Sequence, residues 1–259
     1  MPTDPRWETI GPPPLGLFAV EQVRALRDLA AGRERRKIAR RAAPGDGHAV
    51  LVLPGLLAGD FSTAPLRAFL RDLCYDARGW KLGINRGPAP EKLRALDDRL
   101  ERLFDRHGRR VSLIGWSLGG IFARELARAH PERVRLVVSM GSPFRDISAT
   151  HATRLVPLRR GSTPLEENRD LQTWLRQPLD VPTTSIYSRT DGIVHWQSCL
   201  EEEGPQRENV EVECSHTGMG FHPAVLEVIA DRLGQPEGEW HPYGAPPGHP
   251  ETDSLRRAS

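Results

Sequence analysis

The sequence is poor in cysteine and has no long apolar run. Its 259 residues include only three cysteines, an odd and sparse set that does not form a disulfide framework. We expect buried, reduced thiols, and a single bridge between Cys199 and Cys214 is the alternative. No segment is long and apolar enough to span a membrane. The N-terminal residues MPTDPRWETI lack the basic start and apolar core of a signal peptide, so we expect a cytoplasmic protein.

The chain also lacks an excess of either charge. It carries 36 basic and 34 acidic residues, a formal net charge of +2, and so gives no sign of a nucleic-acid-binding protein. A chain of this length can bury a sizeable core without a metal or a disulfide. Composition therefore allows one large α/β domain or two small ones.

Residues 1–47 form an N-terminal segment. Residues 1–16 contain five prolines, whereas apolar residues recur at helical spacing from Val20 to about Arg41. The recurring positions are Val20, Val23, Leu26, Leu29 and Ala30. Residues 21–41 hold eight basic and three acidic residues, a net charge of +5. We expect a helix packed on the domain with a solvated arginine face; the alternative is peripheral contact with an anionic membrane surface.

Residues 48–234 alternate between strand and helix patterns. The predicted strands are 48–54, 80–84, 111–114, 134–140, 183–188 and 209–213, and the predicted helices are 64–73, 93–104, 118–129 and 223–233. Fully apolar strands that alternate with helices indicate a mostly parallel sheet with helices on both faces. Residues 235–259 are rich in proline, glycine and charge, and we expect a flexible tail.

Residues 144–180 interrupt this alternation. They contain three prolines and short apolar groups such as LVPL and LQTWL. We expect a helical cap over one end of the sheet, with Leu155 and Trp174 lining an acyl pocket. Such a pocket would favour short to medium acyl chains over acetate.

The residues LIGWSLGGIF, 113–122, place a serine between a strand and a helix. Ser117 has Gly115 and Gly119 two residues away on either side. A sharp strand-to-helix turn needs small residues at these places and lifts the serine out of the sheet. It also puts the serine at a helix N-terminus, where free N–H groups favour a developing negative charge. The motif therefore predicts a nucleophilic serine.

The wider pattern resembles the α/β-hydrolase fold. The stretches VLVLPGLLAGDFS, VSLIGWSLGG and VSMGSPF are similar to those of bacterial lipases and esterases, and the resemblance covers about residues 48–234. One difference is Pro54-Gly55, where lipases usually carry His-Gly. The oxyanion donor at that place is a backbone N–H, which the difference does not remove.

The resemblance implies an acid and a base for Ser117. The acid should follow the strand TTSIYS, which indicates Asp191, with Asp146 as the rival. The base should follow the last strand, which indicates His216, with His222 as the rival. His195 lies close to Asp191 in sequence but on the wrong segment. The order serine, aspartate, histidine is the one this fold requires.

The resemblance also indicates how the oxyanion would be held. The donors would be the N–H groups of Leu118, after the nucleophile, and of Leu56, in the loop after the first strand. The candidate pocket residues are Leu57, Trp116, Leu155, Trp174 and Val194. No metal-ligand spacing is present, and no cofactor is implied.

These residues together predict a serine esterase or lipase-like hydrolase with a small-molecule or lipid ester as substrate. A thioesterase or an acyltransferase would use the same three residues. A catalytically silent, hydrolase-like binding protein is the alternative from another class.

Overall fold

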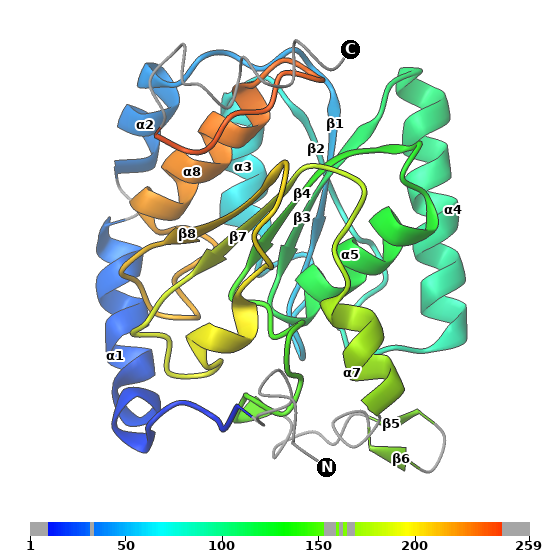
Figure 1. Cartoon of the computed structure of the whole chain (residues 1–259). Helices are drawn as coiled ribbons and strands as arrows, with labels where there is room; N and C mark the ends of the chain where they lie inside the picture. The colour runs from blue at the N-terminus through cyan, green and yellow to red at the C-terminus, as the bar shows by residue number, and fades with distance from the viewer. Residues whose placement is uncertain (1–9, 32–33, 153–158, 161–162, 165–168, 245–259) are drawn as a thin grey trace.

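The structure is a computed structural model, and it describes residues 10–31, 34–152, 159–160, 163–164 and 169–244. Its centre is a sheet of six parallel strands in the order β2-β1-β3-β4-β7-β8 (Figure 1). The strands are β1 (Ala49–Leu53), β2 (Asp76–Gly79), β3 (Val111–Trp116), β4 (Val134–Met140), β7 (Thr183–Tyr187) and β8 (Arg207–Glu211). The predicted mostly parallel sheet between helices is confirmed.

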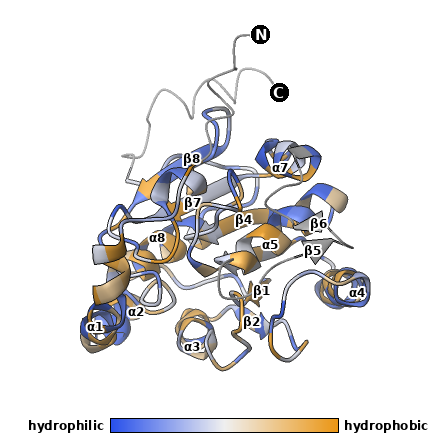
Figure 2. Cartoon of the chain, turned by 90° about the horizontal axis from the view of Figure 1, so that it is seen from below, coloured by the Kyte–Doolittle hydropathy of each residue, from blue (hydrophilic) through white to orange (hydrophobic). Residues whose placement is uncertain are grey.

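Helices cover both faces of the sheet (Figure 2). They are α1 (Leu15–Ala31), α2 (Arg35–Arg41), α3 (Ala64–Asp72), α4 (Pro90–His107), α5 (Leu118–Ala129), α7 (Arg169–Arg176) and α8 (Pro223–Gly234), with the 3-10 helix η4 (Trp196–Cys199). Side chains of α2, α3 and α8 share a buried cluster with one face of the sheet, and those of α4, α5 and α7 share another with the opposite face.

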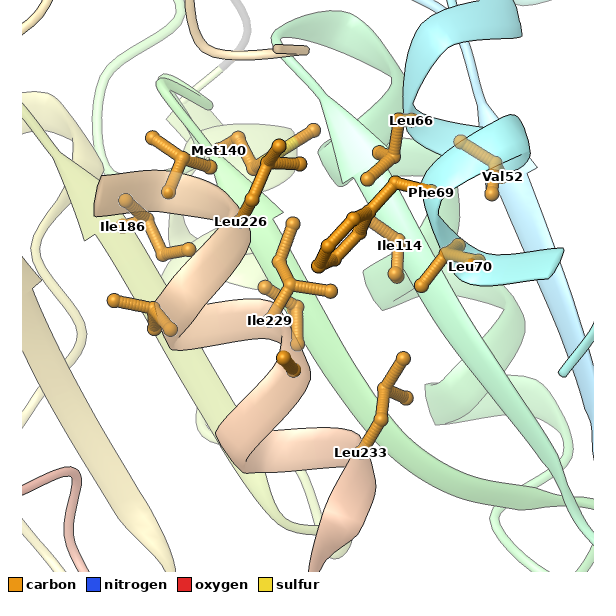
Figure 3. Close-up of a cluster of buried hydrophobic side chains, with 14 of the residues drawn as sticks. Val52, Leu66, Phe69, Leu70, Ile114, Met140, Ile186, Leu226, Ile229 and Leu233 are labelled. Carbon is orange, nitrogen blue, oxygen red and sulfur yellow. The ribbon is translucent and has the colours of Figure 1, made fainter. Parts of the chain in front are cut away.

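The strand β1 shows why both faces must be covered. All five of its residues are buried. Val50 and Val52 enter the first cluster, whereas Leu51 and Leu53 enter the second, as the alternation of side chains along a strand requires. Figure 3 shows the first cluster, in which Phe69 of α3 lies between sheet residues and α8. The apolar run 48–54 is therefore the centre of two cores.

Most of the elements predicted from periodicity are present, but the strand predicted over 80–84 is wrong. The paired strand β2 ends at Gly79, before that stretch. Residues 80–84 form a loop in which the carboxylate of Asp60 accepts the N–H groups of Trp80 and Lys81 at 2.9 and 3.2 Å. The indole N–H of Trp80 donates to the Gly83 carbonyl at 2.9 Å. An ordered loop thus imitates strand alternation.

The segment 144–180 differs from the expected cap. Its described part contains the short antiparallel pair β5 (Arg159–Arg160) and β6 (Thr163–Pro164), followed by α7. Leu175 of α7 is 2% exposed and belongs to the cluster beneath α5. Helix α7 therefore extends the helical layer on one face of the sheet. Leu155 lies outside the described residues.

The first predicted helix divides into α1 and α2, and α1 packs on the domain with its polar side instead of its apolar side. The apolar positions Val20, Val23, Leu26 and Leu29 are 44–69% exposed, whereas Glu21 and Asp28 are buried at 1% and 8%. The polar side of α1 faces the protein. No helix in the described part of the chain is both long enough and apolar enough to cross a membrane.

The two remaining expectations concern the tail and the thiols. Residues 235–244 fold back onto α8 and β8: Arg232 of α8 donates to the His241 carbonyl at 2.6 Å, and the Tyr243 N–H donates to Glu208 of β8 at 2.7 Å. Residues 245–259 lie outside the described part. Cys199 and Cys214 are buried free thiols, and Cys74 is exposed.

Candidate active site

Ser117 occupies a sharp turn between β3 and α5. Its backbone has φ 54° and ψ −123°, a conformation that a residue with a side chain adopts only when its surroundings impose it. The Ser117 N–H donates to the Met140 carbonyl of β4 at 2.8 Å, and its own carbonyl accepts the Gly120 N–H at 2.9 Å. The serine is half-buried at the carboxyl end of the sheet. The sequence motif is thus a strained turn on two rigid elements.

The two flanking glycines are required by close approach. A Cβ at Gly115 would lie 2.3 Å from the Gly119 carbonyl oxygen, and a Cβ at Gly119 would lie 2.3 Å from the Leu53 carbonyl oxygen. Real Cβ atoms do not come that close to backbone. The turn therefore packs against the end of β1 in a way that only glycine permits.

Asp191 and His216 meet beside this turn. The Nδ1 of His216 is 2.7 Å from Oδ2 of Asp191, and both side chains are buried. The other carboxylate oxygen of Asp191 accepts the N–H groups of Ile193 and Val194, both at 2.8 Å. Both Asp191 oxygens are thus engaged, one by the loop and one by the imidazole. This leaves Nε2 of His216 as the ring nitrogen available to a reacting group.

The position of His216 relative to Ser117 follows from its contacts. The indole N–H of Trp116, the residue before Ser117, donates to the His216 carbonyl at 3.1 Å, and the two rings are 6.2 Å apart. A Cβ on Gly141 would lie 2.9 Å from His216 Nδ1, so the end of β4 also reaches the imidazole. The strand ends that hold the serine therefore also hold the histidine loop.

The pKa of His216 lies above that of an ordinary histidine. Burial by itself favours the neutral ring, but the Asp191 carboxylate, by its charge and its hydrogen bond, and the charge of Glu21 more than offset this. The imidazolium form is stabilised in the folded protein. A histidine that must carry a proton briefly is suited to such an environment.

The rival residues take other roles in the structure. Both carboxylate oxygens of Asp146 are engaged elsewhere, with hydrogen bonds from the Ile10 N–H at 2.8 Å and from Ser148 at 2.9 and 2.5 Å. His222 precedes α8 and lies 4.0 Å from Asp28. His195 precedes η4 and stacks on Trp196. The structure brings Asp191 and His216 together and leaves these three apart.

The loop after β1 lies against Ser117 on the other side. A Cβ at Gly55 would lie 3.3 Å from the Ser117 Cβ. Among the hydrogen bonds of the described ranges, none uses the N–H of Leu56 or of Leu118. The N–H groups of Leu118, directly after the serine, and of Leu56, directly after Gly55, thus have no hydrogen-bond partner among the described residues.

A residue that the sequence analysis missed holds this loop in place. Asn85 is fully buried, and its Nδ2 donates to the Pro54 carbonyl at 2.9 Å. Its backbone accepts the Leu57 N–H at 2.7 Å and donates to Ala58 at 2.8 Å. Leu57 has φ 57°, so this turn is also strained. Asn85 lies in the mixed stretch WKLGINRG, which carries no sequence signal that identifies it.

The structure separates the predicted pocket residues. Leu57 is 51% exposed on the loop beside Ser117, and Trp116 is buried against His216. Val194 is 1% exposed and packs in a small cluster with Tyr187 and Cys199, so it does not present its side chain to a substrate.

Trp174 corrects a further expectation. It is 44% exposed, and its indole N–H donates to Glu125 of α5 at 2.8 Å. Glu125 lies eight residues beyond Ser117, about 12 Å along a helix. Trp174 therefore packs on the outside of α5, away from the serine.

Comparison with known proteins gives the same architecture. A sequence model described as the alpha/beta hydrolase family matches residues 49–247. No curated protein sequence matches the chain.

Among solved structures, three similar ones are two lipases and an esterase. The lipase B of Aspergillus fumigatus superposes with a TM-score of 0.57 at 15% identity, covering 81% of this chain and 56% of that enzyme. The mature lipase of Bacillus licheniformis gives 0.56 at 13% identity and covers 74% of this chain and 94% of the lipase. A metagenomic carboxyl esterase gives 0.56 at 13% identity, with 74% and 76% coverage. The chain thus spans a little over half the length of the fungal lipase, and at these identities the likeness concerns the fold.

Proposed function

Since the chain belongs to the alpha/beta hydrolase family, we propose that it is a serine hydrolase that cleaves carboxylic esters through an acyl-enzyme on Ser117. The observation that carries the proposal is the 2.7 Å hydrogen bond between Asp191 and His216 beside the strained serine turn. A serine hydroxyl is a poor nucleophile at neutral pH, and an oriented imidazole is the group that activates it.

In the first half of the reaction, Ser117 Oγ attacks the ester carbonyl carbon while Nε2 of His216 takes the hydroxyl proton. The carbonyl oxygen becomes an oxyanion, which accepts the free N–H groups of Leu56 and Leu118. The Nδ1–H of His216 donates to Asp191, which stabilises the imidazolium. When the tetrahedral intermediate collapses, the C–O bond to the alcohol breaks and Nε2 returns its proton to the leaving oxygen.

In the second half, water replaces the alcohol. His216 accepts a proton from the water as its oxygen attacks the acyl carbon. The bond to Ser117 then breaks, and the proton on Nε2 returns to the serine. The products are a carboxylic acid and the free enzyme, and no cofactor takes part.

The test is labelling with a fluorophosphonate probe combined with hydrolysis of p-nitrophenyl esters from acetate to octanoate. The wild type should react with the probe and hydrolyse at least one ester. Ser117→Ala should lose labelling and about a million-fold in kcat, while its circular dichroism spectrum and melting temperature stay close to wild type. Labelling without hydrolysis of any oxygen ester, but with hydrolysis of acyl thioesters, would assign the same site to a thioesterase. A wild type that neither labels nor turns over would support a silent binding protein.

A further inference from the structure

Helix α1 turns a polar side towards the two loops that carry the acid and the base. Glu21 is 1% exposed and bridges them: one oxygen accepts the N–H of Gly192, next to Asp191, at 3.1 Å. Its other oxygen accepts the N–H of Thr217, next to His216, at 2.9 Å. One carboxylate therefore joins the residue after the acid to the residue after the base.

Two more residues on the same side of α1 extend this contact. Asp28, seven residues after Glu21, accepts both the N–H of Ser215 at 2.8 Å and its hydroxyl at 2.5 Å. Arg24 lies between them and donates to the Thr190 hydroxyl at 2.5 Å. Residues 21, 24 and 28 lie on one face of a helix, and this face is bound to residues 190–192 and 215–217.

The two loops carry glycines that allow α1 to pack closely against them. A Cβ at Gly192 would lie 2.5 Å from the Leu17 carbonyl oxygen, and a Cβ at Gly218 would lie 2.2 Å from the Asp28 carboxylate. Both loops thus carry glycine where α1 approaches most closely. Helix α1 lies outside residues 49–247, which the family model matches, and it contacts both loops directly.

We propose that α1 is a positioning element of the active site, in which Glu21 fixes Asp191 and His216 relative to each other. The inference rests on the proposed function of Ser117, Asp191 and His216. A hydrogen-bonded carboxylate is fixed in both position and charge, so its loss should disturb the alignment of the acid and the base as well as the electrostatics of the imidazole.

Several charged or titratable groups lie on or against the two loops that carry Asp191 and His216, and Glu21 is one of those that act on the protonation of His216. They are Asp191 from the loop after β7, Glu21, Arg24 and Asp28 from α1, and the Cys214 thiol near the end of β8. Among them, Asp191 and Glu21 both raise the pKa of His216. Removal of the Glu21 charge should therefore lower that pKa, whereas a scaffold residue without electrostatic influence would leave it unchanged.

The test compares Glu21→Gln with Glu34→Gln, which removes the same charge from the exposed residue before α2. The pKa of His216 is read by NMR from its ring protons, so this measurement does not depend on turnover. We expect Glu21→Gln to lower it by about half a unit or more and to reduce kcat by about tenfold. Glu34→Gln should change neither quantity.

A second variant keeps the proposal testable if Glu21→Gln does not fold. Glu21→Asp keeps the charge but is too short to reach both N–H groups, so we expect kcat to fall at least about threefold with KM within twofold of wild type. An unchanged His216 titration in folded Glu21→Gln, or a wild-type kcat in Glu21→Asp, would overturn the proposal. A wild type that hydrolyses no ester while its His216 titration shifts in Glu21→Gln would instead contradict the proposed function alone.

The opposite side of α1 supports a second inference from an independent observation. It exposes six large apolar residues on one 17-residue helix. They are Leu15, Phe18, Val20, Val23, Leu26 and Leu29, and the exposed fraction is highest at 70% for Leu15 and 69% for Val23 and Leu26. Helix α1 lies along the left edge of the molecule in Figure 1. Apolar residues gathered in this way mark an interaction surface.

Exposed basic residues on α1 and α2 indicate that the partner of this apolar face is anionic. Arg27 on α1 and Arg36, Lys37, Arg40 and Arg41 on α2 are all exposed. A second copy of the chain would bring two such basic segments together, which is unfavourable, whereas anionic headgroups would neutralise them. We infer that the outer face of α1, with the basic residues of α2, docks on the surface of an anionic lipid bilayer.

Vesicle flotation tests the docking surface. The wild type should float with vesicles containing about 30% phosphatidylserine, bind pure phosphatidylcholine at least about tenfold more weakly, and dissociate as salt rises. The double variant Val23→Ser, Leu26→Ser should lose binding, and Leu93→Ser, an exposed leucine on α4, should keep it. Absence of vesicle binding, or equal binding by the double variant, would overturn the inference. A dimer in analytical ultracentrifugation that the double variant abolishes would also overturn it, because a second copy would then cover this face.

Discussion

Asp191 and His216, 25 residues apart in sequence, share a buried hydrogen bond of 2.7 Å between Oδ2 and Nδ1. The remaining carboxylate oxygen of Asp191 is held by two N–H groups of its own loop. The imidazole is therefore fixed in the tautomer that leaves Nε2 free to accept a proton.

Asp191→Asn should lower kcat by about ten-thousand-fold, because an amide in this place favours the wrong histidine tautomer. Asp146→Asn is the matched control, since Asp146 binds Ile10 and Ser148 and does not contact the histidine. Its kcat should stay within about tenfold of wild type. Steady-state hydrolysis of a p-nitrophenyl ester measures both. Reversed results would assign the acid to Asp146.

The dependence of kcat/KM on pH should report the raised pKa of His216. Only the neutral imidazole can accept the serine proton, and its proton is bound more tightly than in an ordinary histidine with pKa 6.5. Activity should therefore be lost as pH falls through a midpoint above 6.5 and should reach a plateau at higher pH. Rates between pH 4.5 and 9 locate this midpoint. A midpoint below 6 would show that the Asp191 and Glu21 charges do not act on the base.

Gly119→Ala should destabilise the fold as well as remove activity. The new methyl group would lie 2.3 Å from the Leu53 carbonyl, so the end of β1 or the serine turn must move. We expect the free energy of unfolding to fall by at least about 3 kcal/mol, measured by chemical denaturation. Gly234→Ala is the control, because a Cβ at that exposed helix end meets nothing within 4 Å. It should be neutral or stabilise by up to about 1 kcal/mol.

Trp174→Ala should leave the preference for acyl chain length unchanged. Its ring lies on the outside of α5 against Glu125 and Arg128, so its removal should cost only about 1 kcal/mol of stability. Leu57→Ala, on the exposed loop beside the serine, should lower the ratio of octanoate to acetate kcat/KM by about threefold to tenfold. A fall of the octanoate to acetate ratio in Trp174→Ala would show instead that the segment 144–180 lines the acyl pocket.

The spacing of apolar residues correctly predicted those helices and strands that are determined by their own sequence. The helix predicted over 118–129 matches α5, and the strand over 134–140 matches β4, because their apolar spacing and their ends are encoded within each segment. The glycine spacing around Ser117 likewise encodes its own turn. The loop over 80–84 was not predictable by this means, because hydrogen bonds to the carboxylate of Asp60, twenty residues before Trp80, hold that stretch out of the sheet.

The inner face of α1 shows why the orientation of a helix cannot always be predicted from apolar periodicity. Apolar periodicity assumes that the apolar side of a helix is buried, yet here Glu21 and Asp28 face the protein and Leu26 faces outwards. Their partners are backbone N–H groups of loops 171 to 196 residues away, which no local pattern reveals. Asn85 was not recognised for a similar reason, because the Pro54 carbonyl that it binds lies 31 residues away in the loop after β1.

The sequence separation of these contacts also orders the assembly of the molecule. Helix α1 leaves the ribosome long before residues 190–218, to which it binds, are synthesised. Its buried carboxylates have no partner until then, and its docking closes loops of 171 to 196 residues. During translation the alignment of acid and base can therefore be completed only after the loop that carries His216 has emerged, so helix α1 reaches its place long after it has been synthesised.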